Sequence, residues 1–138
     1  MPHAPLPPEV ADRLARPNPA VVAVLLPNGA PMSVATWYLL EDDGTVLLNM
    51  DAERARAAWM REHPQVALTA LDEADWYTHV SIRGTIVRWE DDPATALGDI
   101  DRLARHYTGR PYPNRDRARV SCWVRVDHWH GWGAARRV

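Results

Sequence analysis

The chain has 138 residues, of which 46% are hydrophobic, and its formal net charge at pH 7 is −2. This length suits one domain, residues 1–138, with a single core, and the interleaved charges exclude the basic stripe that follows a nucleic acid. Because no apolar run approaches about 18 residues and the first residues lack a signal-peptide pattern, we expect a cytoplasmic protein without a membrane segment.

The first third of the chain predicts a short helix and then an antiparallel meander. Residues 6–16 have amphipathic spacing with two prolines at the first positions, which is typical of a helix start. The dipeptide Asn28-Gly29 between two apolar runs indicates a hairpin turn. The three strands of this meander are expected at 21–26, 32–40 and 45–50.

The rest of the chain predicts three further strands and two helices. The segment Ala52–Glu62 has the pattern of a short helix, and residues 93–107 have helical spacing of their apolar side chains. Six strands joined mainly by hairpins indicate a mainly β fold, a small closed or split antiparallel barrel over about 20–131. A barrel of this size fills its own interior, so a ligand is expected outside it or in a groove at an interface. The remaining strands are expected at 65–71, 77–90 and 118–126.

Two arginines, Arg54 and Arg56, lie where the helix after the third strand begins. The start of a helix carries the positive end of the macrodipole, so acidic residues suit this position better than arginines. Within a helix these two side chains would point about 200° apart, but in a loop or an opening turn they can converge on one anion. One interpretation is therefore a phosphate or polycarboxylate site. Asp51 as the N-cap and Glu53 in the first turn would also offset the helix dipole. The alternative is that both arginines are solvated and pair with Asp51, Glu53 or Glu62.

The chain shows little catalytic chemistry of its own. It contains no lysine, which excludes a Schiff-base lysine and a P-loop. No serine lies in a nucleophile-elbow sequence, and no carboxylates are placed for glycoside hydrolysis. His128 and His130 share one face of an extended chain, but no third metal ligand is evident, so no metal site is predicted. If the protein is an enzyme, we expect a bound cofactor to carry the reaction.

The aromatic residues and the single cysteine favour packing roles. Trp37-Tyr38 lies within an expected strand and Trp76-Tyr77 at the start of another, positions typical of a core or a dimer interface, with cofactor stacking as the alternative. Cys122 alternates with valines on one strand face, which predicts an inert thiol in the core. A lone cysteine also excludes an internal disulfide.

Several segments follow one another in a specific order. The turn at 27–29 precedes the strand with Trp37-Tyr38, and the basic strand-to-helix segment is followed by "HPQVAL" at 63–68 and "RGT" at 83–85. Over about 21–131 this order resembles the pyridoxamine 5′-phosphate oxidase-like split β-barrels, and within them the B branch of the oxidoreductases that depend on coenzyme F420, a deazaflavin. Arg56 stands where that branch usually has lysine, and a guanidinium fork holds phosphate with a different geometry.

The resemblance implies a six-stranded antiparallel split β-barrel that forms a homodimer, with two cofactors in grooves between the subunits. F420 carries a phosphate and a polyglutamate tail, and the basic pair of the family, matched here by Arg54 and Arg56, would hold that anion. Tyr77 and His79 are possible proton donors, and the loop at Trp76 would close over the groove from the same or the other subunit. Cofactor contacts are implied for Ser33, Thr36, Trp37, Asn49, Met50, Arg54, Arg56, Met60, Trp76 and Tyr77.

The activity that the resemblance implies is that of an F420H2-dependent oxidoreductase. Such an enzyme transfers a hydride from the reduced deazaflavin to an unsaturated or conjugated small-molecule acceptor. Two alternatives stay open at this point, an FMN-dependent oxidase or reductase of the same fold and a non-catalytic F420-binding protein. Neither a nucleic acid nor a membrane is expected as a partner.

Overall fold

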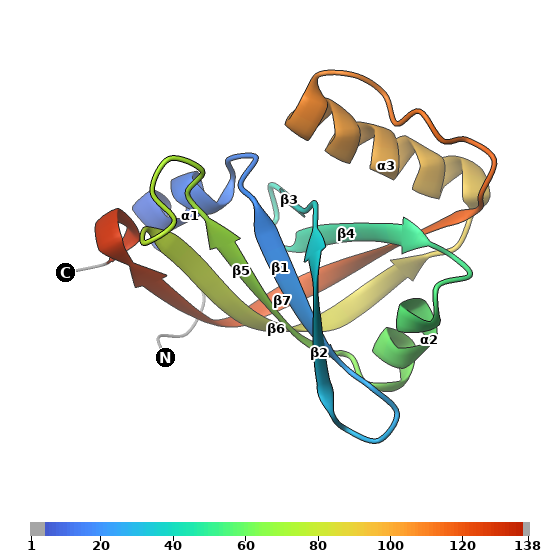
Figure 1. Ribbon diagram of the computed structural model, residues 1–138, viewed down its shortest axis with the longest axis horizontal. Coiled ribbons are helices and arrows are strands. Elements are labelled where there is room, and N and C mark those ends of the chain that lie inside the picture. Colours follow the sequence, from blue (N-terminus) through green and yellow to red (C-terminus); the bar gives the residue numbers. More distant parts are fainter. Residues whose placement is uncertain (1–4, 137–138) are drawn as a thin grey trace.

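A curled antiparallel sheet of seven strands forms the body of the computed structural model, which describes residues 5–136 (Figure 1). The order across the sheet is β2-β1-β5-β6-β7-β4-β3. The predicted mainly β, split-barrel fold is confirmed. The strands are β1 (Ala20–Leu25), β2 (Pro31–Thr36), β3 (Leu39–Leu40), β4 (Val46–Asp51), β5 (Gln65–Leu71), β6 (His79–Glu90) and β7 (Arg119–Trp132). The helices are α1 (Pro8–Leu14), α2 (Ala55–Glu62), α3 (Pro93–Thr108) and the short 3-10 helix η1 (Gly133–Ala135).

A tight turn sets the register of the first hairpin. Between β1 and β2, the Leu26 N–H donates to the Ala30 carbonyl at 2.8 Å, and the Asn28 side chain accepts from the Ala30 N–H at 3.0 Å. Gly29 has a φ of 84°, a left-handed conformation that glycine adopts at little cost. The predicted turn at Asn28-Gly29 is therefore confirmed.

The strand expected at 32–40 is interrupted at Trp37 and Tyr38, so the sheet has seven strands rather than the six predicted. Tyr38 is fully buried, and its hydroxyl donates to the Leu14 carbonyl at 2.5 Å and accepts from the Asn18 side chain at 2.8 Å. This burial raises the pKa of the Tyr38 phenol. The bond to the end of α1 draws the backbone away from the ladder, and β3 then resumes beside β4.

Helix α2 begins later than the sequence predicts. Its first residue is Ala55, and Arg54 is the N-cap in an extended conformation. The prediction that Asp51 caps this helix is wrong. The Asp51 carboxylate instead accepts from the Glu53 N–H and from Arg117, both at 2.9 Å, and so holds the segment before the helix in a turn.

Strand β7 is longer than predicted and continues to Trp132, where the sequence predicts a loop after Val126. The polar and aromatic residues in this stretch form a strand because β6 supplies an equally long partner. His79 pairs with Trp132, and Ser81 pairs with His130. Long-range pairing therefore overrides a weak local strand pattern.

Two hydrophobic clusters hold the elements together. The larger lies between the sheet and helices α1 and α2 and contains Cys122, which is fully buried. Burial raises the pKa of the Cys122 thiol to about 12, as expected for an inert core thiol. The smaller cluster packs α3 against β4 and β7 and consists of Leu47, Ile100, Leu103 and Trp123.

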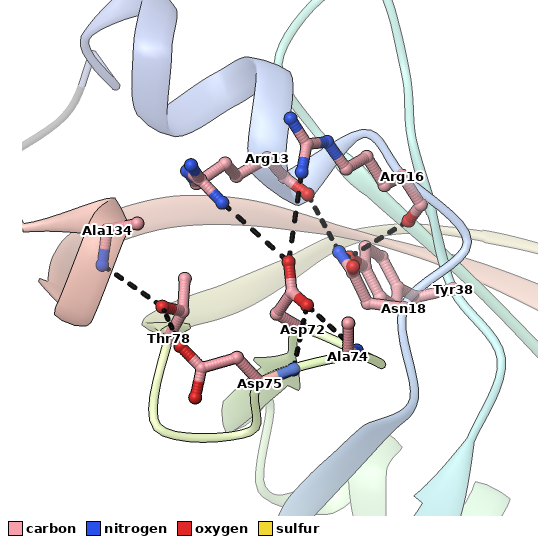
Figure 2. A network of polar contacts seen from close by, with 9 residues as sticks. All are labelled: Arg13, Arg16, Asn18, Tyr38, Asp72, Ala74, Asp75, Thr78 and Ala134. Carbon is pink, nitrogen blue, oxygen red and sulfur yellow. Dashed lines mark hydrogen bonds and ion pairs between the residues drawn. The ribbon is translucent and has the colours of Figure 1, made fainter.

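A polar network fastens α1 to the loop between β5 and β6 (Figure 2). Arg13 and Arg16 lie 3.7 and 3.8 Å from the carboxylate of Asp72. The same carboxylate accepts from two backbone N–H groups of the loop, at 2.9 and 3.0 Å. Tyr38 binds the Leu14 carbonyl at the same end of α1, so the C-terminal end of this helix is held both by the β5–β6 loop and by the segment between β2 and β3.

We predict that Tyr38→Phe lowers the free energy of unfolding by about 1–3 kcal/mol, because it removes the bonds of the Tyr38 hydroxyl to the Leu14 carbonyl and to one N–H of the Asn18 amide. Chemical denaturation followed by tryptophan fluorescence measures this loss. Tyr77→Phe is the matched control, since Tyr77 is 54% exposed, and it should leave stability unchanged. Equal stabilities of the two variants would contradict the role given to the Tyr38 hydroxyl.

Candidate functional site

A groove of about 1070 Å³ lies between helix α3 and the strands of the sheet. Its walls come from β1, β2, β4, the start of α2, α3 and the loop between α3 and β7, residues 109–118. It therefore collects residues from almost the whole length of the chain. The groove lies outside the larger core cluster, as expected for a barrel that fills its own interior.

Six of the ten predicted cofactor contacts line this groove. Arg54 and Arg56 meet there because Arg54 precedes α2 in an extended conformation while Arg56 lies in its first turn. This is the convergence that the sequence allows for an opening turn. The six residues are Thr36, Trp37, Asn49, Met50, Arg54 and Arg56.

The other predicted site residues do not line the groove. Met60 is fully buried in the core beneath α2, so within this chain it is not part of the groove wall. Ser33 lies on β2 opposite Ala23, nearer the hairpin. Trp76, Tyr77 and His79 lie in the β5–β6 loop and at the start of β6, and Trp76 is 73% exposed. A role for these three residues stays a prediction.

Four arginines stand at one end of the groove, and the sequence analysis found only two of them. Arg117 and Arg119 come from the end of the α3–β7 loop and the start of β7. The pairing of β4 with β7 places Arg119 directly opposite Asp51 and so beside Arg54 and Arg56. The cluster "RDRAR" at 115–119 was the only local signal, and it does not reveal this pairing.

Three of these arginines have no carboxylate partner among residues 5–136. Arg117 is paired with Asp51 at 2.9 Å, whereas no carboxylate oxygen in the described part of the chain lies within 4.0 Å of Arg54, Arg56 or Arg119. Burial, followed by the nearby charge of Arg54, lowers the pKa of Arg56, and burial also lowers the pKa of Arg119. An anion that enters the groove would relieve this unneutralised positive charge.

The wall under α3 is aromatic and apolar. Trp37 stacks on Tyr107 with ring centroids 5.4 Å apart, and Tyr112 meets Trp37 edge-on at 6.3 Å. The Tyr107 hydroxyl donates to the Asn18 carbonyl at 2.7 Å, and burial raises the pKa of this phenol to about 12. The groove thus combines a basic end with a flat aromatic wall, which suits a planar ligand that carries an anionic tail.

A buried carboxylate ties the α3–β7 loop to α3. Arg115 donates to both oxygens of Asp101, at 2.9 and 3.0 Å, and the Tyr112 N–H donates to the same carboxylate at 2.9 Å. Because Tyr112 and Arg117 belong to this loop, the tie also fixes their positions in the groove.

The described residues contain neither a candidate metal site nor a candidate membrane-spanning helix. Among residues 5–136, no three side chains of His, Cys, Asp or Glu gather in a way that could hold a metal ion. Within the same residues, none of the helices has the length and apolar composition needed to span a membrane.

The fold defines a split-barrel protein, and comparison with protein families agrees. The family described as Pyridoxamine 5′-phosphate oxidase matches residues 6–133. The chain belongs to this family. No curated protein matches the sequence.

Solved structures with the same fold include proteins of different descriptions. An F420 reductase has a TM-score of 0.76 at 24% identity, covering 90% of this chain and 98% of its own. A conserved hypothetical protein from Mycobacterium tuberculosis has a TM-score of 0.73 at 22% identity, covering 94% and 86%. General Stress Protein 26 from Bacillus anthracis has a TM-score of 0.66 at 14% identity, covering 90% and 91%. At sequence identities of 24% or less, the structural similarity to these proteins establishes a shared fold.

We predict that Asp101→Asn loosens the α3–β7 loop and accelerates tryptic cleavage after its arginines several-fold at pH 8. Arg115 lowers the pKa of Asp101, so the tie is present at neutral pH and is lost only as the pH falls through that lowered pKa. Mass spectrometry of timed digests identifies the cut sites. Asp42→Asn removes an exposed carboxylate outside this loop and should leave the rate unchanged. Equal rates for both variants would show that Asp101 does not hold the loop.

Proposed function

We propose that this protein is an F420H2-dependent oxidoreductase that binds the deazaflavin coenzyme in the groove and reduces an unsaturated or conjugated small molecule. The observation that carries this proposal is the set of three arginines without carboxylate partners at one end of a groove with an aromatic wall. F420 is a polyanion through its phosphate and polyglutamate tail. Its tail therefore suits Arg54, Arg56 and Arg119.

The size of the groove supports a large ligand. Pockets for small molecules and cofactors usually enclose about 300–1,000 Å³, and this groove has about 1070 Å³. We expect a cavity of this volume to take a tricyclic ring beside Thr36 and Trp37 together with an acceptor molecule. When bound, reduced F420 supplies the hydride, which is chemistry that no side chain of the protein can provide.

The residues of the chain bind, orient and shield in this proposal. Ile100 and Leu103 of α3 line the groove and keep water from the reacting faces. The Thr36 hydroxyl donates to the Trp37 carbonyl at 2.8 Å, which stabilises the backbone where β2 ends. The proton donors suggested by the sequence, Tyr77 and His79, lie outside the groove of their own chain, so their assignment requires a second subunit that closes over it.

A homodimer is part of the proposal, and the outward face of the sheet supports it. Small side chains form two rows across β2, β1 and β5. Val21 lies on the middle strand of one row and is 38% exposed. Such a face can approach a second copy closely, and it leaves apolar surface in water when unpaired. The rows contain Ala35, Val21 and Thr69 in one case and Ser33, Ala23 and Ala67 in the other.

We predict that sedimentation equilibrium gives twice the 15.6 kDa mass of one chain. Ala23→Arg places a charged side chain in the middle of this face and should yield monomers. Ala58→Arg on the exposed side of α2 is the control and should stay dimeric. If the wild-type protein is a monomer, the proposed homodimer is wrong, and Tyr77 and His79 cannot act on the groove of a second subunit.

We predict micromolar binding of F420 and much weaker binding of FMN in parallel titrations that follow tryptophan fluorescence, since Trp37 lines the groove. Arg54→Ala combined with Arg56→Ala should weaken F420 binding at least tenfold, about 1.4 kcal/mol, without unfolding the protein. Arg83→Ala combined with Arg105→Ala removes two exposed charges outside the groove and is the matched control.

The outcomes of this titration separate the candidate functions. A preference for FMN would indicate the flavin-dependent alternative on the same fold. F420 binding without reduction of any tested acceptor would indicate a non-catalytic binding protein. Binding of neither cofactor, or equal binding by both double variants, would contradict the proposed site. A cytoplasmic location stays a prediction from the sequence.

A further inference from the structure

A chain of buried hydrogen bonds leads from helix α3 to Arg119 at the basic end of the groove. Asp99 accepts from the Ser121 hydroxyl at 2.8 Å, and Ser121 accepts from the side-chain amide of Asn49 at 2.9 Å. The Asn49 carbonyl oxygen accepts from Nε of Arg119 at 2.9 Å. Ser121 is fully buried, and Asp99 and Asn49 are 8% and 9% exposed, so water has little access to the bonds among these three residues, whereas the bond to Arg119 lies partly buried at the wall of the groove.

The direction of each bond in this chain is determined by two groups that can only accept, the Asp99 carboxylate and the Ala96 carbonyl. A carboxylate can only accept, so the Ser121 hydroxyl must donate to Asp99 and offers its lone pairs to Asn49. Asn49 must therefore present its NH2 group, which also donates to the Ala96 carbonyl at 2.9 Å. This leaves the Asn49 carbonyl oxygen facing Arg119.

Arg119 is held in a defined orientation as a result. Its Nε is bonded to Asn49, and its guanidinium lies 5.1 Å from the ring centroid of Tyr112. The two terminal nitrogens form the fork that binds phosphate or carboxylate in pairs. Among residues 5–136 no carboxylate lies within 4.0 Å of Arg119.

The far end of the chain is also fixed. Arg102 donates to Asp99 at 3.1 Å and to both oxygens of Glu41 at 2.8 and 2.9 Å. Trp123 donates to the same Glu41 through its indole N–H at 2.9 Å. These bonds raise the pKa of Arg102 and lower the pKa of Glu41, so the ion pair is present at neutral pH.

We propose that Asp99, Ser121 and Asn49 form a relay of positioning residues that orients Arg119 and so gives the groove its anion-binding geometry. The proposal rests on the proposed function, in which Arg119 takes part in holding the anionic part of the cofactor. A buried polar chain of this kind gives little net stability compared with well-packed apolar residues, whereas a fixed guanidinium binds an anion with less loss of side-chain entropy.

The first experiment needs no ligand and measures exchange of the Arg119 Nε–H proton with water by 15N NMR. In the wild type the bond to Asn49 should make this exchange slow. Ser121→Ala removes the link, and Asp99→Asn removes the carboxylate that fixes the direction of the Ser121 hydroxyl, so both variants should speed exchange at least tenfold. Asp127→Asn breaks the ion pair with Arg125, which does not contact the relay, and should leave exchange unchanged. Slow exchange in both relay variants would overturn the proposal.

The second experiment tests the effect on binding with inorganic pyrophosphate and F420 as separate probes. Ser121→Ala should weaken pyrophosphate binding at least threefold, and it should have no further effect in a protein that already carries Arg119→Ala. A merely structural role of Ser121 would give the same loss in both backgrounds, and that result would overturn the proposal. Thermal unfolding of each variant confirms that the protein remains folded at the titration temperature.

The two probes separate failure of the relay from failure of the proposed function. If the wild type binds pyrophosphate with the expected coupling but does not bind F420, the relay stands and the proposed cofactor is wrong. If F420 binds but the coupling is absent, the proposed function stands and the relay is wrong. If the wild type binds neither probe, Arg119 has no anion to hold and both are overturned.

Discussion

The pairing of β4 with β7 is the constraint on which the groove depends. It brings together segments that lie 70 residues apart, with Asn49 opposite Ser121 and Asp51 opposite Arg119. Every residue of β4 is buried, because the core covers one face of the strand and α3 covers the other. A polar side chain in such a strand must find a partner, since an unsatisfied buried group costs about 1–3 kcal/mol. The hydrogen bonds at this end of the groove therefore follow from the position of the strand in the sheet.

The charges at the basic end of the groove favour the binding of an anion at the expense of the stability of the folded chain. Asp51 neutralises Arg117, but Arg54, Arg56 and Arg119 retain their charges close to one another, and partial burial lowers the pKa of the latter two. Like charges of this kind destabilise the folded chain until an anion joins them. Local features that oppose stability are typical of functional sites, and here they mark the basic end of the groove.

The sequence predicts the parts of this structure that local chemistry determines. The Asn28-Gly29 turn and the apolar runs beside it are sufficient for the first hairpin, and Arg54 drew attention because an arginine is unfavourable at the start of a helix. Contacts between residues that only strand pairing brings together cannot be predicted from local sequence, so the sequence analysis missed Arg119. The break of the second strand was also missed, because it depends on the bond of Tyr38 to a helix more than twenty residues earlier.

Helix α3 acts on Arg119 from two sides, which makes its position part of the site. Asp99 reaches the guanidinium through Ser121 and Asn49, and Asp101 reaches it through the loop that places the Tyr112 ring beside it. Residues two apart on a helix point in nearly opposite directions, so these two carboxylates can anchor the sheet and the loop separately. A shift of α3 relative to the sheet would therefore disturb both supports at once. The aromatic wall beneath α3 and the basic end of the groove consequently form one structural unit, in which the packing of the helix and the geometry of anion binding cannot change independently.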